Sequence, residues 1–440
     1  MSRFDIPVLG APRRTNPIAL RGDIRFVSDD ERLLYDPHFS ASEGCPSQSE
    51  PEGFEVAGPR REIFFDPEHT RAAIVTCGGL CPGINAVIRA LVLQLWFIYG
   101  CRDILGIRYG YHGLGRAREA PRALTPADVG DIHRQGGTVL GSSRGTPPTA
   151  EIVDTLQELG IDMLFTIGGD GTMRGATAIA DEVARRGLEI AVVGIPKTID
   201  NDIPLVRRTF GFETAVSIAT ESINAAQVEA WGVENGIGIV KLMGRYSGYI
   251  AATATLSSGH ANFCLIPEVP FSLEGPGGLY ELVERRLRER GDAVIVLAEG
   301  AGQYYFETPE RERDASGNPK LGDIGVLVRD RLKSWLRSRG IHAPIKYIDP
   351  SYLIRAAPAI SSDQLYCQRL ARNAVHAAMS GKTAMLIGYW HGQMTHVPMS
   401  ALRGLSRQVN PCGELWFNVL ESTGQPQTIG DISYIDLEEE

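Results

Sequence analysis

Short apolar runs alternate with longer amphipathic segments from Arg71 to Trp390. The runs AAIVTC, MLFTIG, IAVVGIP and AVIVLAEG are continuously apolar, as in strands that are buried on both faces. Segments such as INAVIRALVLQLW, ATAIADEVARRG and FETAVSIATESINAAQVEA have helical apolar spacing. The alternation predicts an α/β fold of parallel sheets with helices on both faces.

Composition limits the class of protein. The chain has 440 residues, of which 43% are hydrophobic, enough for a large core and roughly two or three domains. A net charge of −9 argues against broad binding of nucleic acid or anionic membranes. The longest apolar stretch is too short and interrupted to span a bilayer, and the N-terminus lacks the apolar core of a signal peptide. We therefore expect a cytoplasmic protein without nucleic-acid or membrane partners.

Cysteines and histidines do not suggest a metal site. The seven cysteines are scattered, and Cys77 and Cys81 form a CxxxC pair without a second half. We interpret them as reduced thiols of a cytosolic protein. The nine histidines show no metal-ligand spacing.

Two polar stretches flank or interrupt this pattern. Residues 1–70 are rich in Pro, Arg, Asp and Ser, and predict an N-terminal extension that is partly flexible. Residues 308–323 carry charged residues and turn formers, and predict an exposed loop.

Two glycine-rich turns follow apolar strands. In AAIVTCGGLCPGINAVIRALV the turn contains Gly79, and in MLFTIGGDGTMRGA it contains Asp170. Glycines let backbone N–H groups approach a phosphate, and a helix N-terminus favours negative charge. A carboxylate in such a turn fits a nucleotide–Mg²⁺ site. The first motif could instead be a tight structural turn, and the Asp of the second could instead cap a helix.

A third motif, GIPKTIDNDIP, places a cation and carboxylates at the end of a core strand. If the segment is extended, Thr198, Asp200 and Asp202 project to one side because strand side chains alternate. One carboxylate could then accept a hydroxyl proton while the other organises metal or water. The segment could instead be an acidic turn whose side chains bond to nearby backbone.

Further candidates follow later strands. Arg245 comes after Gly244 in VKLMGRYSG, and an arginine there suits bidentate phosphate binding or is simply exposed. Glu299 ends another strand, and Lys346, Tyr352 and Arg355 belong to KYIDPSYLIR.

Two motif matches are misleading. GSSRG at 141–145 has the nucleophile-elbow spacing, but TPPT follows where that motif needs a helix. GKT at 381–383 lacks the earlier glycine of a P-loop and follows a predicted helix, so Gly381 is interpreted as a helix C-cap.

Taken together, the motifs resemble those of the ATP/pyrophosphate phosphofructokinase family. CGGLCPGINAVIR, IGGDGT, PKTIDND, KLMGR, LAEG and PSYLIR occur in that family's order, between about Arg71 and Tyr389. The resemblance implies two doubly wound, Rossmann-like parallel-sheet domains with the active site in the cleft between them. It implies transfer of the γ-phosphoryl of ATP to the 1-hydroxyl of fructose 6-phosphate, the committing step of glycolysis, with Mg²⁺ as cofactor.

The resemblance also implies roles for individual residues. Asp200 would be the general base, assisted by Lys197 and Arg245, and Asp170 would bind Mg²⁺. The implied phosphoryl-donor residues are Gly79, Arg144, Gly145, Gly169, Asp170, Gly171 and Thr172. The implied sugar residues are Thr198, Asp200, Met243, Gly244, Arg245, Glu299, Lys346, Tyr352, Leu353, Ile354 and Arg355.

Departures from the bacterial ATP-dependent pattern point to the pyrophosphate-type branch, which includes ATP-using members. Lys197 stands where that pattern has Gly, Tyr352 where it has His, and Gly236 and Lys346 where it has Arg. Pyrophosphate users carry Asp after the metal-binding Asp, whereas this chain has Gly171. A carboxylate there would repel the nucleotide α-phosphate, so we expect ATP as the donor, with a pyrophosphate-dependent phosphofructokinase as the alternative.

By resemblance, 71–211 plus 353–405 form the donor domain, 212–352 the fructose 6-phosphate domain, and 406–440 a tail that packs on the body. We expect a homo-oligomer, a dimer or tetramer, with allosteric control possible.

Two different functions compete with this interpretation. One is a silent regulatory subunit, against which the presence of Asp170, Asp200 and Arg245 argues. The second is a lipid or NAD kinase, because GGDGT also occurs in those enzymes. PKTIDND and PSYLIR are not expected there, so the combined motifs favour a phosphofructokinase.

Overall fold

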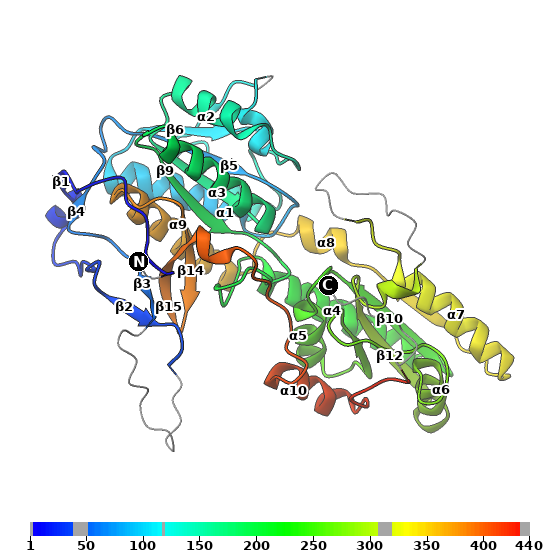
Figure 1. Ribbon diagram of the computed structural model, residues 1–440. Coiled ribbons are helices and arrows are strands. Elements are labelled where there is room, and N and C mark those ends of the chain that lie inside the picture. Colours follow the sequence, from blue (N-terminus) through cyan, green and yellow to red (C-terminus); the bar gives the residue numbers. More distant parts are fainter. Residues whose placement is uncertain (1–2, 38–51, 117–118, 307–318, 432–440) are drawn as a thin grey trace, which may run out of the picture. The chain divides into compact units, whose positions relative to one another are not determined.

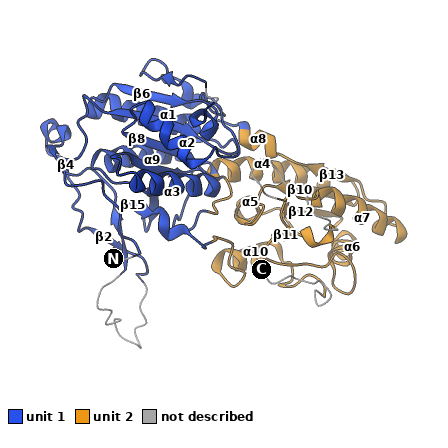
Figure 2. Ribbon diagram, turned by 45° about the horizontal axis from the view of Figure 1, so that its top comes forward, with its two compact units in different colours: residues 1–198, 203–211, 356–405 blue, residues 199–202, 212–355, 406–440 orange. Residues whose placement is uncertain are grey.

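The computed structural model describes residues 3–37, 52–116, 119–306 and 319–431 (Figure 1). Residues 1–2 and 38–51 of the predicted N-terminal extension, and most of the predicted loop at 308–323, lie outside these ranges. The chain forms two compact units (Figure 2). Unit 1 comprises residues 1–198, 203–211 and 356–405, and unit 2 comprises residues 199–202, 212–355 and 406–440.

Within the described residues, unit 1 contains a nine-stranded sheet. Its order is β2 (Arg32–Leu34), β3 (Gly53–Val56), β15 (Gln393–Pro398), β14 (Met385–Trp390), β9 (Ala191–Pro196), β8 (Met163–Gly168), β5 (Arg71–Thr76), β6 (Asp103–Ile107) and β7 (Arg122–Ala123). The central strands β14, β9, β8, β5 and β6 are parallel. The flanking strands pair antiparallel, which the uniformly apolar runs did not predict.

Helices cover both faces of this sheet. Helices α2 (Thr149–Glu158) and α3 (Asp170–Arg185) pack together over alternate strand residues such as Ala73 and Val75. Helices α1 (Ile84–Leu93) and α9 (Ser361–Met379) pack against each other, and α1 continues as a π-helical turn over Gln94–Tyr99. The predicted α/β architecture of this unit is confirmed, because its apolar strands are sandwiched between amphipathic helices.

The N-terminal segment is part of this sheet. Strand β3 pairs with β15, and Phe54 packs against Phe4, Tyr35 and Trp390. A separate two-stranded sheet joins β1 (Arg14–Thr15) to β4 (Glu62–Ile63). The segment therefore contributes backbone pairing and apolar contacts to unit 1.

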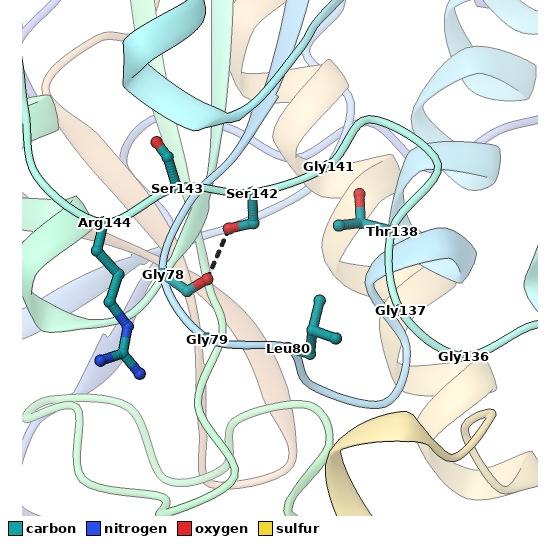
Figure 3. A pocket seen from close by; sticks show the side chains of 10 residues that line it. All are labelled: Gly78, Gly79, Leu80, Gly136, Gly137, Thr138, Gly141, Ser142, Ser143 and Arg144. Atoms are coloured by element: carbon teal, nitrogen blue, oxygen red, sulfur yellow. Dashed lines mark hydrogen bonds between the residues drawn. The ribbon is translucent and has the colours of Figure 1, made fainter. Parts of the chain in front are cut away.

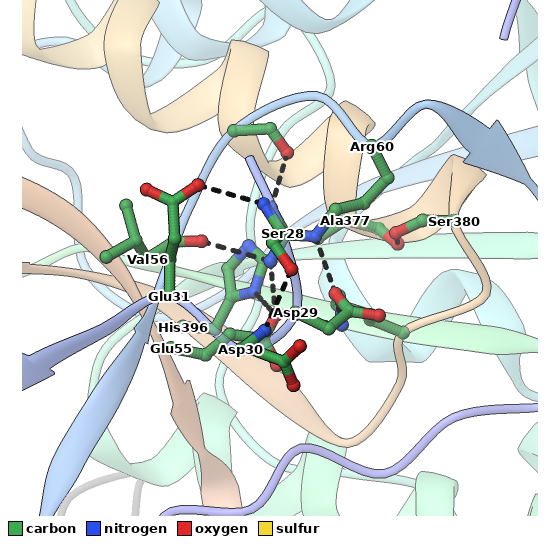
Figure 4. Close-up of polar contacts among 12 residues, drawn as sticks. Ser28, Asp29, Asp30, Glu31, Glu55, Val56, Arg60, Ala377, Ser380 and His396 are labelled. Atoms are coloured by element: carbon green, nitrogen blue, oxygen red, sulfur yellow. Dashed lines mark hydrogen bonds and ion pairs between the residues drawn. The ribbon is translucent and has the colours of Figure 1, made fainter. Parts of the chain in front are cut away.

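A charged cluster, buried except for Asp29, also attaches this segment to the rest of unit 1 (Figure 4). Arg60 donates to Asp29 and Glu55, each at 2.6 Å, and Lys382 Nζ lies 2.8 Å from the same two carboxylates. His396 Nδ1 lies 2.7 Å from Glu55 Oε1. Burial alone would raise the pKa of Glu55, but His396 and Lys382 outweigh it and lower that pKa to about 2.

Unit 2 contains a four-stranded parallel sheet in the described part of the chain. Its order is β11 (Phe263–Leu265), β12 (Asp292–Ala298), β10 (Gly236–Leu242) and β13 (Ile345–Ile348). Helices α4 (Phe212–Trp231) and α5 (Tyr249–Ser258) pack on each other and on the sheet. Helices α6 (Leu279–Arg290) and α7 (Ile324–Ser338) share an apolar cluster with strands of this sheet. Helix α8 (Ser351–Ala356) follows β13, and α10 (Glu414–Thr423) packs on α5.

Short 3₁₀ helices complete the described secondary structure: η1 (Pro17–Arg21), η3 (Gly110–Leu114), η4 (Ile132–Arg134), η5 (Gln303–Tyr305) and η6 (Met399–Leu402). No helix formed by the described residues is long and apolar enough to cross a membrane.

The two misleading motifs lie where the sequence predicted. Gly381 has φ 77° and its N–H donates to the Ala378 carbonyl at 2.8 Å, directly after α9, so it terminates that helix. After GSSRG the next α-helix begins at Thr149, and the strand–turn–helix geometry of a nucleophile elbow is absent from these described residues.

Candidate functional site

A glycine-lined pocket lies beyond the carboxyl end of β5 (Figure 3). Gly78, with φ 81°, begins the turn that leads to α1, and only glycine adopts that conformation without cost. Gly78 N donates to Ser143 O at 3.0 Å, and Ser142 Oγ donates to Gly78 O at 2.6 Å. These bonds fix the loop at 136–144 beside the turn.

The pocket has a volume of about 550 Å³, which is within the usual range for a small-molecule site. It is lined by Gly78, Gly79, Leu80, Gly136, Gly137, Thr138, Gly141, Ser142, Ser143 and Arg144. Of these, the sequence predicted Gly79 and Arg144. The glycine density at 136–141 was the signal that could have identified the rest. Backbone near so many glycines can approach a phosphate closely, and Arg144 adds a cation.

The second predicted donor segment begins α3 at the end of β8. Gly169 is the N-cap, and Asp170 is the first helical residue. The Asp170 side chain is 53% exposed and forms an ion pair with Arg174, one turn later. Thr172 is buried, and its backbone N donates to Gly169 O at 2.9 Å. The segment thus presents a carboxylate at a helix N-terminus, where negative charge is favoured.

Lys197 joins these segments at the end of β9. Its backbone N donates to Gly168 O at 2.9 Å, and its ammonium Nζ donates to Gly79 O at 2.6 Å. The residue is only 5% exposed. Because β5, β8 and β9 are adjacent parallel strands, their carboxyl ends bring the GGLCPG, GGDGT and PKT segments together, as expected at the ligand edge of such a sheet.

The extended conformation assumed for PKTIDNDIP is wrong. The strand pairing ends at Lys197, the chain bends at Ile199 and Asp200, and Asn201 has φ 55°. A left-handed residue breaks the alternation of side chains, so the argument that Thr198, Asp200 and Asp202 share one side does not hold. The bend arises where the chain leaves β9, and it agrees with the acidic turn that the sequence left open as the alternative.

In unit 2, the MGR and EG segments lie side by side. Glu299 N donates to Leu242 O at 2.8 Å, and Gly300 N donates to Gly244 O at 3.1 Å. A Cβ on Gly300 would stand 1.9 Å from the Arg245 carbonyl, so this approach requires glycine. Met243 is buried, whereas Arg245 is partly exposed and donates to the Pro319 carbonyl.

Helix α8 presents some of the PSYLIR residues and buries another. Tyr352 and Leu353 are 83% and 70% exposed, and Arg355 is partly exposed. Ile354 is fully buried. Asp349 stands two residues before this helix, and its Oδ1 accepts from Ser351 N, the first helical residue, at 3.0 Å.

Lys241, near the end of β10, connects the segments that precede α7 and α8. Its Nζ lies 2.9 Å from both Asp323 Oδ2 and Asp349 Oδ2, and its side chain is 13% exposed. Asp323 caps α7 through Val326 N, whereas Asp349 precedes α8. Burial alone would lower the pKa of Lys241, but the two carboxylates outweigh it and raise that pKa, so the lysine is fully charged.

Lys346 is placed apart from the other predicted sugar residues. It pairs with Gly238, midway along β10, whereas Met243–Arg245 follow that strand's carboxyl end. Its Nζ lies 3.4 Å from Glu229 Oε2, and both side chains are exposed.

The chemistry of Asp170 fits Mg²⁺. This ion prefers oxygen ligands, keeps several waters and commonly binds through one or two carboxylates plus substrate phosphates. An exposed carboxylate at the same sheet edge as a glycine-rich pocket suits that arrangement. The described residues contain no group of three or more His, Cys, Asp or Glu suited to a metal, and a site completed by phosphate and water does not require one.

Comparison with known proteins decides the family. The phosphofructokinase family model matches residues 71–378, which is most of the chain. The chain belongs to the phosphofructokinase family. The resemblance seen in the sequence is therefore confirmed.

Relatives within the phosphofructokinase family match along nearly the whole chain. An ATP-dependent 6-phosphofructokinase of Borreliella burgdorferi is 48% identical over 434 residues, covering 96% of this chain and 97% of the relative. One of Amycolatopsis methanolica is 48% identical over 440 residues, covering 98% and 94%. The crystal structure of a pyrophosphate-dependent phosphofructokinase of Marinobacter aquaeolei has a TM-score of 0.66 at 21% identity, covering 82% and 92%. That likeness confirms the phosphofructokinase fold.

Proposed function

We propose that this chain is an ATP-dependent 6-phosphofructokinase. It transfers the γ-phosphoryl group of ATP to the 1-hydroxyl of fructose 6-phosphate and gives fructose 1,6-bisphosphate and ADP, the committing step of glycolysis. The observation that carries the proposal is the 48% identity, over nearly full length, to relatives named for this activity. Gly171 supports ATP over pyrophosphate, because it leaves the α-phosphate unopposed.

The glycine pocket is the proposed phosphoryl-donor site. Backbone N–H groups near Gly79 and the α3 N-terminus would bind phosphate oxygens, with Arg144 and Gly145 beside them. The remaining donor residues in this proposal are Gly169, Asp170, Gly171 and Thr172. Asp170 would hold Mg²⁺, which when bound neutralises charge on the transferring phosphates. For Asp170 to do so, its ion pair with Arg174 must open.

Asp200 is the proposed general base. It accepts the proton of the 1-hydroxyl as the oxygen attacks the γ-phosphorus and the bond to ADP breaks. Lys197 and Arg245 offset the negative charge that develops on the phosphoryl oxygens. Most of the rate enhancement then comes from positioning and charge neutralisation.

The proposed fructose 6-phosphate residues are Thr198, which follows β9, and residues of unit 2, Asp200 among them. Thr198 and Asp200 would contact the sugar. Met243, Gly244, Arg245, Glu299, Tyr352, Leu353 and Arg355 would surround it, with arginine suited to the 6-phosphate. Ile354 is buried and would support α8 from the interior. Lys346 would contact the sugar only if its ion pair with Glu229 opens.

A donor assay tests the function. Purified protein with fructose 6-phosphate and Mg²⁺ should turn over with ATP and show little activity with pyrophosphate. Preference for pyrophosphate would support the alternative function, and activity with neither donor would overturn both. Titrating Mg²⁺ in the same assay tests the cofactor.

We also propose a cytoplasmic location and a homo-oligomeric assembly, a dimer or tetramer. Light scattering after size exclusion would give the assembly's mass, and a monomer mass would overturn that proposal.

A further inference from the structure

The backbone beside the proposed base adopts a left-handed conformation. Asn201, next to Asp200, has φ 55° and is only 5% exposed. Asparagine adopts this left-handed conformation more readily than other non-glycine residues, and bonds to its backbone from neighbouring groups can hold it there. Whatever holds the Asp200–Asn201 backbone therefore also sets the position of the base.

Two side chains bond to consecutive carbonyls at this point. Arg407 Nη1 donates to Asn201 O at 2.7 Å. Ser247 Oγ donates to Asp200 O at 3.3 Å, and Ser247 is 1% exposed. Arg407 comes from the C-terminal segment, beyond the region matched by the family model, and Ser247 follows the MGR segment.

The segment that carries Arg407 is itself fixed. The Arg407 guanidinium lies 4.7 Å from the ring centroid of Tyr249, and Tyr249 OH donates to Gln408 O at 2.7 Å. Gln408 Nε2 donates to Tyr246 O at 3.1 Å, and Val409 N donates to Glu268 Oε1 at 2.8 Å. Residues 407–409 are thus attached to the start of α5 through several bonds.

Glu268 completes this attachment. Its carboxylate also accepts from Gly248 N, at 2.9 and 3.1 Å, where α5 begins. The same carboxylate therefore bonds to the C-terminal segment and to the residue that follows Ser247. Ser247 and Arg407, which bond to the carbonyls of Asp200 and Asn201, are therefore both positioned by one short region of unit 2.

We propose that Arg407 is a positioning residue for phosphoryl transfer, acting through the Asn201 carbonyl to fix the backbone that carries Asp200. The inference rests on the proposed role of Asp200 as general base. The Arg407 guanidinium stacks on Tyr249, which leaves little freedom in the bond to Asn201. A base displaced by about 1 Å costs roughly 100-fold in rate, which makes such a contact consequential. The competing interpretation is that Arg407 merely attaches the C-terminal segment.

The test compares Arg407→Met with Arg407→Lys in the full-length enzyme. The matched control is Arg403→Met, a change four residues before Arg407. It removes an exposed ion pair with Asp181. Values of kcat, KM for both substrates and Tm are measured for each. We expect Arg407→Met to lower kcat about 10- to 100-fold. KM for fructose 6-phosphate should stay within about threefold, because ground-state binding is retained. Arg407→Lys should recover part of kcat, and Arg403→Met should behave like wild type.

Unchanged kcat in Arg407→Met would overturn the proposal. So would a rise in KM alone, or a lower Tm accompanied by a loss of kcat that Arg407→Lys does not recover. If Arg407→Met does not fold, Ser247→Ala provides the test, because it removes the bond to the Asp200 carbonyl, and wild-type kcat in that variant would refute positioning. If wild type prefers pyrophosphate, the same comparison is made with that donor, since the loop acts on the sugar hydroxyl. Failure of the proposed function is then distinguished from failure of this inference.

Discussion

The Lys197 ammonium lies 2.6 Å from the carbonyl oxygen of Gly79, which is 118 residues earlier in the chain. The bond links the turn after β5 to the residue that ends β9. It places a buried positive charge at the glycine-rich loop, where a chain of net charge −9 needs one to bind phosphates.

Replacing this lysine tests the link. Lys197→Met should lower kcat about 100-fold or more, because it removes a preorganised cation near the transferring charge. Steady-state kinetics with ATP and fructose 6-phosphate provide the measurement. Lys333→Met, at an exposed position of α7, is the control for loss of one positive charge. A Lys197→Met enzyme with normal kcat would show that the bond to Gly79 is purely structural.

Asp200→Asn tests the general base. Asparagine keeps the shape of the side chain but cannot accept the hydroxyl proton, so kcat should fall by about 10²–10⁴-fold. Affinity for fructose 6-phosphate should change only severalfold. Single-turnover rates and equilibrium binding separate the two effects, and near-normal turnover in pure mutant protein would contradict the assignment.

Gly171 tests the donor choice. A Cβ at this position would have Arg174 Nη2 as its nearest neighbour, at 3.7 Å, so an added side chain fits without a clash. A carboxylate within about 4 Å of the α-phosphate is repulsive by a few kcal/mol at an effective dielectric near 20. Gly171→Asp should therefore cripple use of ATP, without by itself giving an efficient pyrophosphate enzyme.

The control for that change is Gly171→Ala, which adds a methyl group without charge and should retain most activity. Because Arg174 can partly neutralise the new carboxylate, Gly171→Asp combined with Arg174→Met should use ATP still less well. Equal losses in the Ala and Asp variants would mean that space, not charge, decides the donor.

Lys241 tests how α8 is supported. Lys241→Met leaves the Asp323 and Asp349 carboxylates close together without the cation between them, which should lower Tm and disturb the start of α8. KM for fructose 6-phosphate should rise about tenfold or more, because Tyr352 and Arg355 follow directly. Lys333→Met, at an exposed position of α7, is the control. A rise of KM in Lys346→Met would instead support Lys346 as a sugar residue.

The cluster around His396 predicts acid sensitivity. Burial, opposed in part by Glu55, lowers the pKa of His396 to about 4. The unfolded chain, with a histidine pKa near 6.5, therefore binds more protons, and stability falls as the pH drops from about 6.5 to about 4. The lowered pKa of Glu55, about 2, adds a further loss as the pH falls from about 4.5 to 2.

Thermal unfolding across this pH range provides the measurement. His396→Asn should reduce the loss of stability between pH 6.5 and 4. The loss that remains is due to His376, because burial lowers the pKa of that histidine to about 3. The exposed His342→Asn should leave the profile unchanged. An unaltered profile in His396→Asn would show that the buried histidine does not govern acid stability.

The central strands and the helices that follow them were predictable, because buried runs such as MLFTIG carry the signal themselves. The motifs also located the ends of β5, β8 and β9. What sequence could not give depends on distant partners: the contact between Arg407 and Asn201, and the antiparallel β3–β15 edge. The pattern of residues along one segment does not indicate which distant segment it will contact in the fold.

Glu55 and His396 form a bond although they are 341 positions apart in the sequence. Strands β14 and β15 of the nine-stranded sheet also lie late in the chain, between residues 385 and 398. During synthesis, the ribosome must therefore release the chain through about residue 398 before that sheet can be completed. Nascent chains that end before residue 385 would leave the β9 edge unpaired, and unpaired strand edges favour aggregation. We therefore expect incomplete chains that lack β14 and β15 to aggregate more readily than chains that contain them.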